Sequence, residues 1–265
     1  MSLRIGWFST GKDKQALFLL KQTCKAIEEK ELEDVRINFL FCNREKGENR
    51  ETDRFIEEVE KMGIPIVVFS SRKFNPEMRK KALKYAKEGK YSLLENWRTL
   101  YDEEIMKRIE KYRFDLILLA GYMLVVGEKL CQRYILLNLH PALPGGPKGS
   151  WQEVIWELIR QKAKKTGIMI HKVTPQLDAG PALAFCEFPI TGHGFDDLWQ
   201  ELERKIKKKT LEEIIKEEGV KEPLFSAIRK EQKKREAPLI IHTLKLIAEG
   251  KINPQMIKKP VLLEI

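Results

Sequence analysis

The sequence contains no apolar run long enough to cross a membrane and no pair of cysteines spaced to hold a metal. A membrane-spanning helix needs roughly 20 predominantly apolar residues, and no stretch of this chain approaches that length. The 4 cysteines are widely scattered along 265 residues, and no two of them form a C-x-x-C pair. We therefore expect no membrane association, no disulfide framework and no metal site.

Signal-peptide features, internal repeats and low-complexity segments are also missing. Residues 3–8 form a strand-like run without the charged and apolar regions of a signal peptide, so we expect a cytoplasmic protein. With 43% hydrophobic residues in a chain of 265, the protein can bury the core of one large domain or of two smaller ones. This composition argues against a disordered or fibrous class.

Basic residues exceed acidic ones, which gives a formal net charge of +10. Such an excess suits anionic ligands, such as phosphates or polyglutamate tails, and also nucleic acid. However, charged residues make up 33% of the chain, and lysine and glutamate are interleaved almost throughout. This mixture is typical of heat-adapted surfaces. We favour that interpretation and do not expect nucleic acid as a partner.

Strand and helix signals alternate along the first half of the chain. Short apolar runs predict buried strands, and amphipathic or charged helical segments separate them. The predicted strands are residues 3–8, 35–42, 64–69 and 115–120. Alternation of this kind predicts an α/β fold, a Rossmann-like and mostly parallel sheet with helices on both faces. In such sheets ligands bind outside the carboxyl ends of the strands.

The pattern changes after residue 134. A strand at 135–140 leads into the loop P-A-L-P-G-G-P-K-G-S, and helical periodicity extends over residues 151–165. Two further strands are predicted at 167–173 and 182–190. From residue 195 onward the chain is helical and heavily charged.

Two polar side chains stand at the end of the strand at 135–140. Side chains alternate between the faces of a strand, so Asn138 and His140 share one face. Pro141 cannot continue a central ladder, which places His140 at the strand's end. An amide N–H can stabilise the oxyanion of acyl transfer. An imidazole can do the same or act as general acid or base.

A carboxylate is needed to orient the imidazole, and Asp178 is the candidate because Gly180 and Pro181 mark it as a loop residue. A structural interpretation remains open on spacing alone. A strand-terminal Asn-x-His can simply hydrogen-bond loop backbone, and an Asp near Gly is a common turn former.

Several motifs together resemble the folate-dependent formyltransferases, and among them the enzymes that formylate glycinamide ribonucleotide. They are N-L-H-P at residues 138–141, L-D-A-G-P at 177–181, L-A-G-Y-M at 119–123 and G-I-M-I-H at 167–171. The similarity extends from residue 3 to about residue 194 and resumes near Glu236. The resemblance implies a catalytic domain at 1–194 and a helical segment at 195–265 packed on the same domain. A charged insertion at about 205–233 has no assigned role.

The resemblance also implies roles for individual residues. Asn138, His140 and Asp178 would be catalytic, and the formyl donor would be 10-formyltetrahydrofolate, with no metal. Folate-binding residues would be Tyr122, Met123, Leu124, Val125 and Val173. Acceptor-binding residues would be Thr10, Gly11, Lys12, Asp13, Arg98 and Glu236.

The first turn, Ser9 to Lys14, departs from the family's glycine-rich phosphate loop. One glycine remains, and Lys12 and Lys14 could bind an anion through charge instead. A plain polar turn that caps the next helix is an equal alternative. Leu124 stands where the family often has an arginine.

The leading functional hypothesis is formyl transfer to the amine of glycinamide ribonucleotide in purine biosynthesis. A second keeps the chemistry but changes the acceptor to a nucleotide-linked amino sugar or an initiator tRNA. A third is a non-enzymatic basic α/β protein that binds RNA or another anion. The partners we expect are a phosphorylated amine and a folate, and a homodimer is one option for the oligomeric state.

Overall fold

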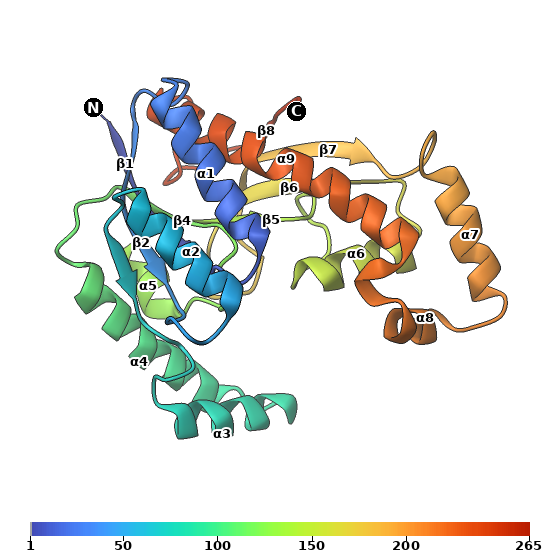
Figure 1. Ribbon diagram of the computed structural model, residues 1–265, viewed down its shortest axis with the longest axis horizontal. Coiled ribbons are helices and arrows are strands. Elements are labelled where there is room, and N and C mark those ends of the chain that lie inside the picture. Colours follow the sequence, from blue (N-terminus) through green and yellow to red (C-terminus); the bar gives the residue numbers. More distant parts are fainter. Residues whose placement is uncertain (1) are drawn as a thin grey trace.

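A single sheet organises residues 2–265, the part of the chain that the computed structural model describes. Its strand order is β3-β2-β1-β4-β5-β6-β7-β8 (Figure 1). The first five strands in this order are parallel, β6 and β7 run antiparallel to their predecessors, and β8 is parallel to β7. The strands are β1 (Leu3–Ser9), β2 (Val35–Cys42), β3 (Ile66–Val68), β4 (Leu116–Leu119), β5 (Leu136–His140), β6 (Lys165–Lys172), β7 (Ala182–Pro189) and β8 (Val261–Leu262).

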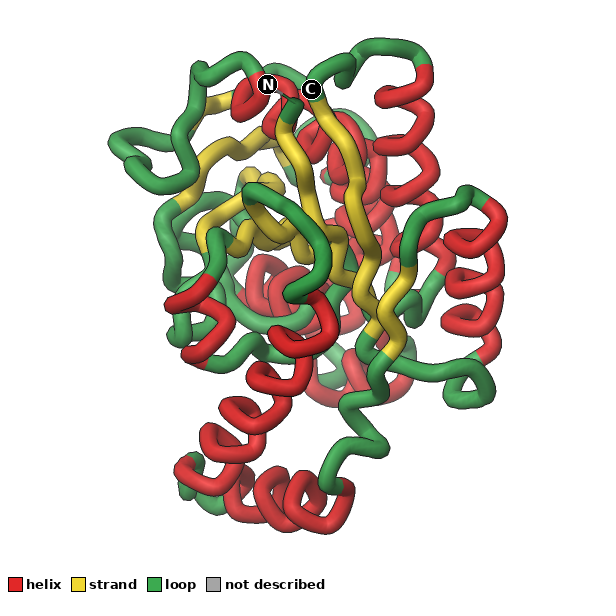
Figure 2. The backbone as a smooth tube through the Cα atoms, turned by 90° about the vertical axis from the view of Figure 1, so that its left-hand side faces the viewer, coloured by secondary structure: helices red, strands yellow, loops and turns green. Residues whose placement is uncertain are grey.

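Helices cover both faces of this sheet (Figure 2). One face packs against α1 (Lys14–Glu28), α2 (Arg50–Lys61) and the long α9 (Pro223–Ala248). The other packs against α3 (Pro76–Lys87), α4 (Ser92–Ile109) and α5 (Glu128–Arg133). A third apolar cluster joins α6 (Trp151–Arg160), α7 (Asp196–Ile206) and α8 (Leu211–Glu217) to the first turns of α9. A short 3-10 turn, η1 (Gly219–Lys221), precedes α9.

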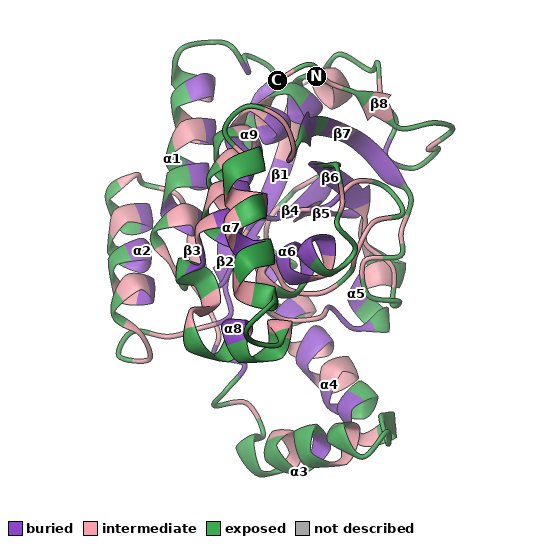
Figure 3. Cartoon of the chain, turned by 90° about the vertical axis from the view of Figure 1, so that its right-hand side faces the viewer, coloured by how far each residue is buried: buried purple, intermediate pink, exposed green. Residues whose placement is uncertain are grey.

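The strands are continuously apolar because both faces are covered. In β1, Ile5 and Trp7 point into the cluster with α1, α2 and α9, whereas Phe8 points to the α4 side. The three side chains are fully buried, as expected for a parallel sheet between two helical layers. Figure 3 shows the buried strands, while α3 and α7 present long exposed faces.

The predicted fold class is confirmed, and two expectations need correction. The helix expected over 151–165 ends at Arg160, because the chain turns there and Lys165 begins β6. The charged carboxyl-terminal segment also contains β8, a strand of 2 residues that pairs with β7. A strand of 2 residues is too short for an apolar pattern to predict it from the sequence.

The charged segment after residue 195 forms three α-helices and packs on the rest of the chain. Helix α9 lies beside α1 and across β6 and β7 (Figure 1). The side chain of Glu222 accepts a hydrogen bond from the backbone N–H of Phe225 and so caps α9. Within the described residues, no helix is both long enough and apolar enough to span a bilayer.

Candidate active site

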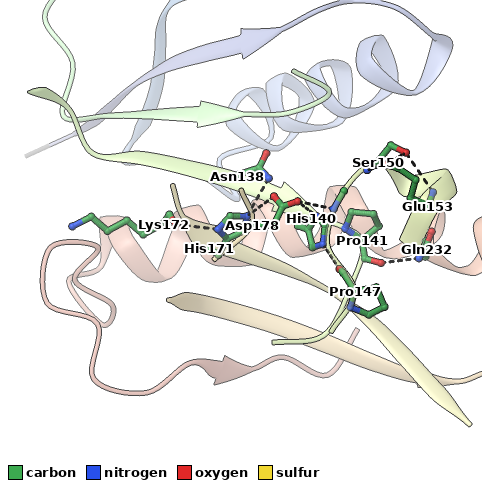
Figure 4. A network of polar contacts seen from close by, with 11 residues as sticks. Asn138, His140, Pro141, Pro147, Ser150, Glu153, His171, Lys172, Asp178 and Gln232 are labelled. Carbon is green, nitrogen blue, oxygen red and sulfur yellow. Dashed lines mark hydrogen bonds and ion pairs between the residues drawn. The ribbon is translucent and has the colours of Figure 1, made fainter. Parts of the chain in front are cut away.

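A cavity of about 370 Å³ lies at the carboxyl ends of β4 and β5. Its walls come from the first turn of α1, residues 121–126, the end of β5, the loop before α6, the loop between β6 and β7, and α9. Strand order reverses between β1 and β4 in this sheet, and α/β folds bind ligands beside such a point. The cavity contains the polar cluster seen in Figure 4.

Strand β5 brings Asn138 and His140 to the same side of the sheet. The register pairs Asn138 with His171 on β6 and His140 with Met169. Pro141 follows directly and ends the strand. His140 is 2% exposed, so its ring is held by the protein rather than by solvent.

Asp178 reaches this cluster from the loop between β6 and β7. Its backbone is left-handed, with φ of 46°, and its Oδ2 accepts a hydrogen bond of 3.0 Å from the backbone N–H of Gly149. The loop docks closely on β6 at Gly180, where a Cβ would come within 1.7 Å of the carbonyl oxygen of Lys172. Only glycine fits that approach, and the approach fixes where the Asp178 carboxylate points.

The hydrogen bonds of His140 define its tautomer. Its Nε2 lies 2.9 Å from the carbonyl oxygen of Pro147, which cannot donate, so Nε2 carries the hydrogen. In the neutral ring Nδ1 is then a free base, 3.6 Å from Asp178 Oδ2. Burial lowers the pKa of His140 below its ordinary 6.5, against the opposing effect of the Asp178 carboxylate. His140 is therefore neutral at pH 7.

His171 supports the same cluster from β6. Its Nδ1 donates to the carbonyl oxygen of Lys172 at 3.0 Å, so Nε2 accepts from the amide of Asn138 at 3.1 Å. The same Nε2 lies 3.5 Å from Asp178 Oδ1. Asn138 Nδ2 thus points one hydrogen at His171 and keeps a second one for a ligand.

The carboxyl group of Asp178 is ionised in this setting. Burial alone would raise its pKa, but the imidazoles of His171 and His140 and the hydrogen bond from the Gly149 N–H together lower the pKa below its ordinary 3.8. A carboxylate, a neutral imidazole and an amide donor therefore meet at one wall of the cavity. This set suits an acyl transfer in which an amine loses a proton and a carbonyl oxygen gains negative charge.

The formyl transferase family model matches residues 12–217 of the chain. The phosphoribosylglycinamide formyltransferase of Dictyostelium discoideum is 31% identical over 178 residues, which are 63% of this chain and 80% of that protein. The Bacillus subtilis enzyme of the same name is 28% identical over 119 residues, 44% of this chain and 60% of that protein. The chain belongs to the formyl transferase family.

Solved structures agree with the fold of this formyltransferase. The glycinamide ribonucleotide transformylase 1 of Symbiobacterium toebii superposes with a TM-score of 0.66, covering 99% of this chain and 95% of the other. At 17% sequence identity, this likeness concerns the fold alone.

Most of the binding residues predicted for this formyltransferase line the cavity. On the folate side these are Tyr122, Met123, Leu124, Val125 and Val173. On the acceptor side, Asp13 and Glu236 line it as well. Their roles in binding stay predictions.

Four predicted acceptor residues do not lie among the described residues that line the cavity: Thr10, Gly11, Lys12 and Arg98. Thr10 is buried, and its hydroxyl accepts from the backbone N–H of Met123 at 2.7 Å. Gly11 packs against Phe55, and Lys12 is exposed. Arg98 lies within α4 beside Asp102. Thr10 therefore shapes the cavity wall through the segment that contains Met123.

Sequence reasoning missed two polar residues of the site. His171 ends the motif at 167–171 but receives no role there, and its position opposite Asn138 follows from strand pairing that the sequence does not reveal. Arg229 lies at the cavity wall on α9. It stands in a stretch so rich in charge that no pattern distinguishes it from its neighbours.

Proposed function

We propose that this formyltransferase moves the formyl group of 10-formyltetrahydrofolate to the amine of glycinamide ribonucleotide, a step of purine biosynthesis. The observation that carries the proposal is the contact between His140 and Asp178 beside Asn138 at the end of β5. The identity to relatives that are named phosphoribosylglycinamide formyltransferases supports the choice of acceptor.

The proposed reaction follows from these groups. The acceptor amine attacks the formyl carbon, and the carbonyl electrons move to oxygen, where the free Asn138 N–H stabilises the oxyanion. The proton of the attacking nitrogen passes to His140 Nδ1, and the ionised Asp178 stabilises the imidazolium. The intermediate collapses as the bond from the formyl carbon to folate nitrogen breaks, and that nitrogen takes the proton from the His140 imidazolium, which returns to its neutral form. The products are the formylated amine and tetrahydrofolate.

The cavity suits a folate in size and lining. Its volume of about 370 Å³ falls in the range of small-molecule sites. Tyr122, Met123 and Val125 give one wall an apolar character, which a flat heterocycle can contact.

The test measures formyl transfer from 10-formyltetrahydrofolate to glycinamide ribonucleotide by monitoring the tetrahydrofolate that forms. We expect turnover by the parent and a loss of about a hundredfold or more in His140→Ala and Asp178→Asn. His242→Ala is the matched control, because that histidine lies on the exposed side of α9 and bonds Pro238 within its own helix. Turnover with an amino sugar nucleotide or a tRNA in place of glycinamide ribonucleotide would contradict the acceptor but not the chemistry.

The altered first turn supports a second candidate for the acceptor. It lacks the run of glycines expected of a phosphate loop, so an amine acceptor with a different anchoring group fits the same catalytic cluster. The family assignment leaves the non-enzymatic interpretation without support. A cytoplasmic location, a homodimer and the division into 1–194 and 195–265 stay predictions.

A further inference from the structure

Arg229 has a fixed position at the cavity wall. It belongs to the charged segment 205–233, for which the sequence suggests no role. Its side chain is 12% exposed, and its guanidinium carbon lies 4.8 Å from the centre of the Trp151 ring. Stacking on an aromatic face holds a guanidinium in one plane.

One edge of this guanidinium is unused within the protein. Its hydrogen bonds go to Glu236 Oε1 at 2.6 Å and to Gln232 Oε1 at 3.3 Å, and both use Nη1. Nε is buried and has no hydrogen-bond partner. The Nε–Nη2 edge is one with which arginine binds phosphate or carboxylate through two parallel hydrogen bonds. A buried N–H without an acceptor is unfavourable, and a bound oxyanion would remove that cost.

Arg229 is also the one lysine or arginine among the described residues that line the cavity. Four carboxylates line the same space: Asp13, Glu153, Asp178 and Glu236. An anionic acceptor would be repelled from most of this wall. Among the charged side chains of this wall, Arg229 is the one that would attract it.

The start of α1 offers no comparable site. The Asp13 side chain accepts a hydrogen bond of 3.1 Å from the backbone N–H of Ala16, so a carboxylate already occupies this helix end. The positive end of a helix normally attracts a phosphate. Here a phosphate would face Asp13.

The two partners of Arg229, Gln232 and Glu236, connect it to the end of β5 and to α1. Gln232 Nε2 donates to the carbonyl oxygen of Pro141, next to His140, at 2.9 Å. Gln15 of α1 donates to Glu236 Oε2 at 2.7 Å. These bonds fix the distance between Arg229 and the catalytic strand.

We propose that Arg229 binds the phosphate of the acceptor through its Nε–Nη2 edge, in place of the glycine-rich first turn. This rests on the proposed function, because it assigns the anionic group of that acceptor to a particular side chain. It gives the charged segment 205–233 a function in substrate recognition.

The test compares the binding of ribose 5-phosphate and of ribose by calorimetry, without any formyl transfer. We expect the parent to bind ribose 5-phosphate at least about tenfold more tightly than ribose, and Arg229→Met to lose that preference. Arg235→Met is the matched control. Arg235 lies on the same helix, stacks on Phe188 at 4.4 Å and pairs with Glu231 at 2.8 Å, but it is not among the described residues of the cavity wall.

The proposal would be overturned if Arg229→Met still preferred ribose 5-phosphate to ribose. It would also be overturned if the parent showed no such preference. If Arg229→Met does not fold, Arg229→Lys keeps the charge and removes the two-donor edge. Its preference must then fall below that of the parent, and an unchanged ratio refutes the role of that edge. A parent that binds ribose 5-phosphate through Arg229 but does not formylate glycinamide ribonucleotide would contradict the proposed function and leave the phosphate site in place.

Discussion

His140 Nδ1 and Asp178 Oδ2 lie 3.6 Å apart in a buried setting, one at the end of a strand and the other in a distant loop. The gap exceeds a hydrogen bond. It closes to one when His140 takes up a proton, because the imidazolium then has a donor on the side of the carboxylate. The pair is therefore arranged to receive a proton rather than to hold one.

The rate of formyl transfer should fall on acidification through the pKa of His140. Burial lowers that pKa below 6.5, so the base form is populated at neutral pH and is lost only at lower pH. We expect an acidic limb of kcat/KM with a midpoint below 6.5. The Asp178→Asn variant, which lacks the charge that raises the pKa, should show its midpoint at still lower pH. A parent midpoint above 6.5 in the pH profile would contradict the assignment.

His171→Phe should reduce kcat less than His140→Ala does. The substitution keeps a ring in β6 but removes the acceptor for Asn138 and the partner of Asp178. Loss of one such hydrogen bond corresponds to about a tenfold fall in kcat. The pH midpoint should stay on the acidic side, since His140 itself is intact. Steady-state kinetics would tell whether His171 positions the cluster or carries the proton. If His171 carried the proton, its substitution would lower kcat as much as His140→Ala does.

Gly180→Ala should displace the loop that carries Asp178. A Cβ there would meet the Lys172 carbonyl at 1.7 Å, and backbone cannot yield as a flexible side chain does. We expect a loss of about 1–3 kcal/mol in stability and at least a tenfold fall in activity. Ala179→Gly is the neighbouring control, which adds no atom. Thermal melting and the transfer assay measure the two effects, and an unchanged rate would show that the loop tolerates displacement.

Asp102 should make folding stability depend on pH in an unusual direction. Burial raises its pKa from 3.8 to about 6, against the N–H groups of Leu130 and Gly127. The folded state thus binds the proton more tightly than the unfolded state. The contribution of Asp102 to folding stability is therefore complete below pH 3.8 and is lost as the pH rises through about 6. The loss amounts to about 3 kcal/mol.

Asp102→Asn removes this dependence and serves as the reference. Denaturant unfolding at pH 4 and pH 7 should show that the parent's advantage over the variant shrinks toward neutral pH. An advantage that grows with pH would mean that the two backbone N–H groups outweigh burial and that the carboxylate is ionised throughout.

Sequence reasoning predicted the sheet well because its strands are buried on both faces and read as short apolar runs. Asn138 and His140 could be placed on one face by alternation alone. Asp178 could be named as the partner carboxylate, but its approach to His140 could not be predicted, because it depends on how the loop docks at Gly180. Arg229 and β8 could not be predicted from the sequence for a related reason. Arg229 stands in a helix rich in charged residues, and β8 is 2 residues long, so tertiary contacts set the positions of both.

The bond from Gln232 to the Pro141 carbonyl has a consequence for assembly of the enzyme during synthesis. The catalytic strand β5 (Leu136–His140) precedes α9 (Pro223–Ala248) in the chain and is therefore translated first. The acceptor wall exists only after α9 docks. A nascent chain whose α9 has not yet docked would therefore contain His140 and Asp178 but lack the proposed acceptor-binding wall. It would discriminate among amines only after α9 has docked.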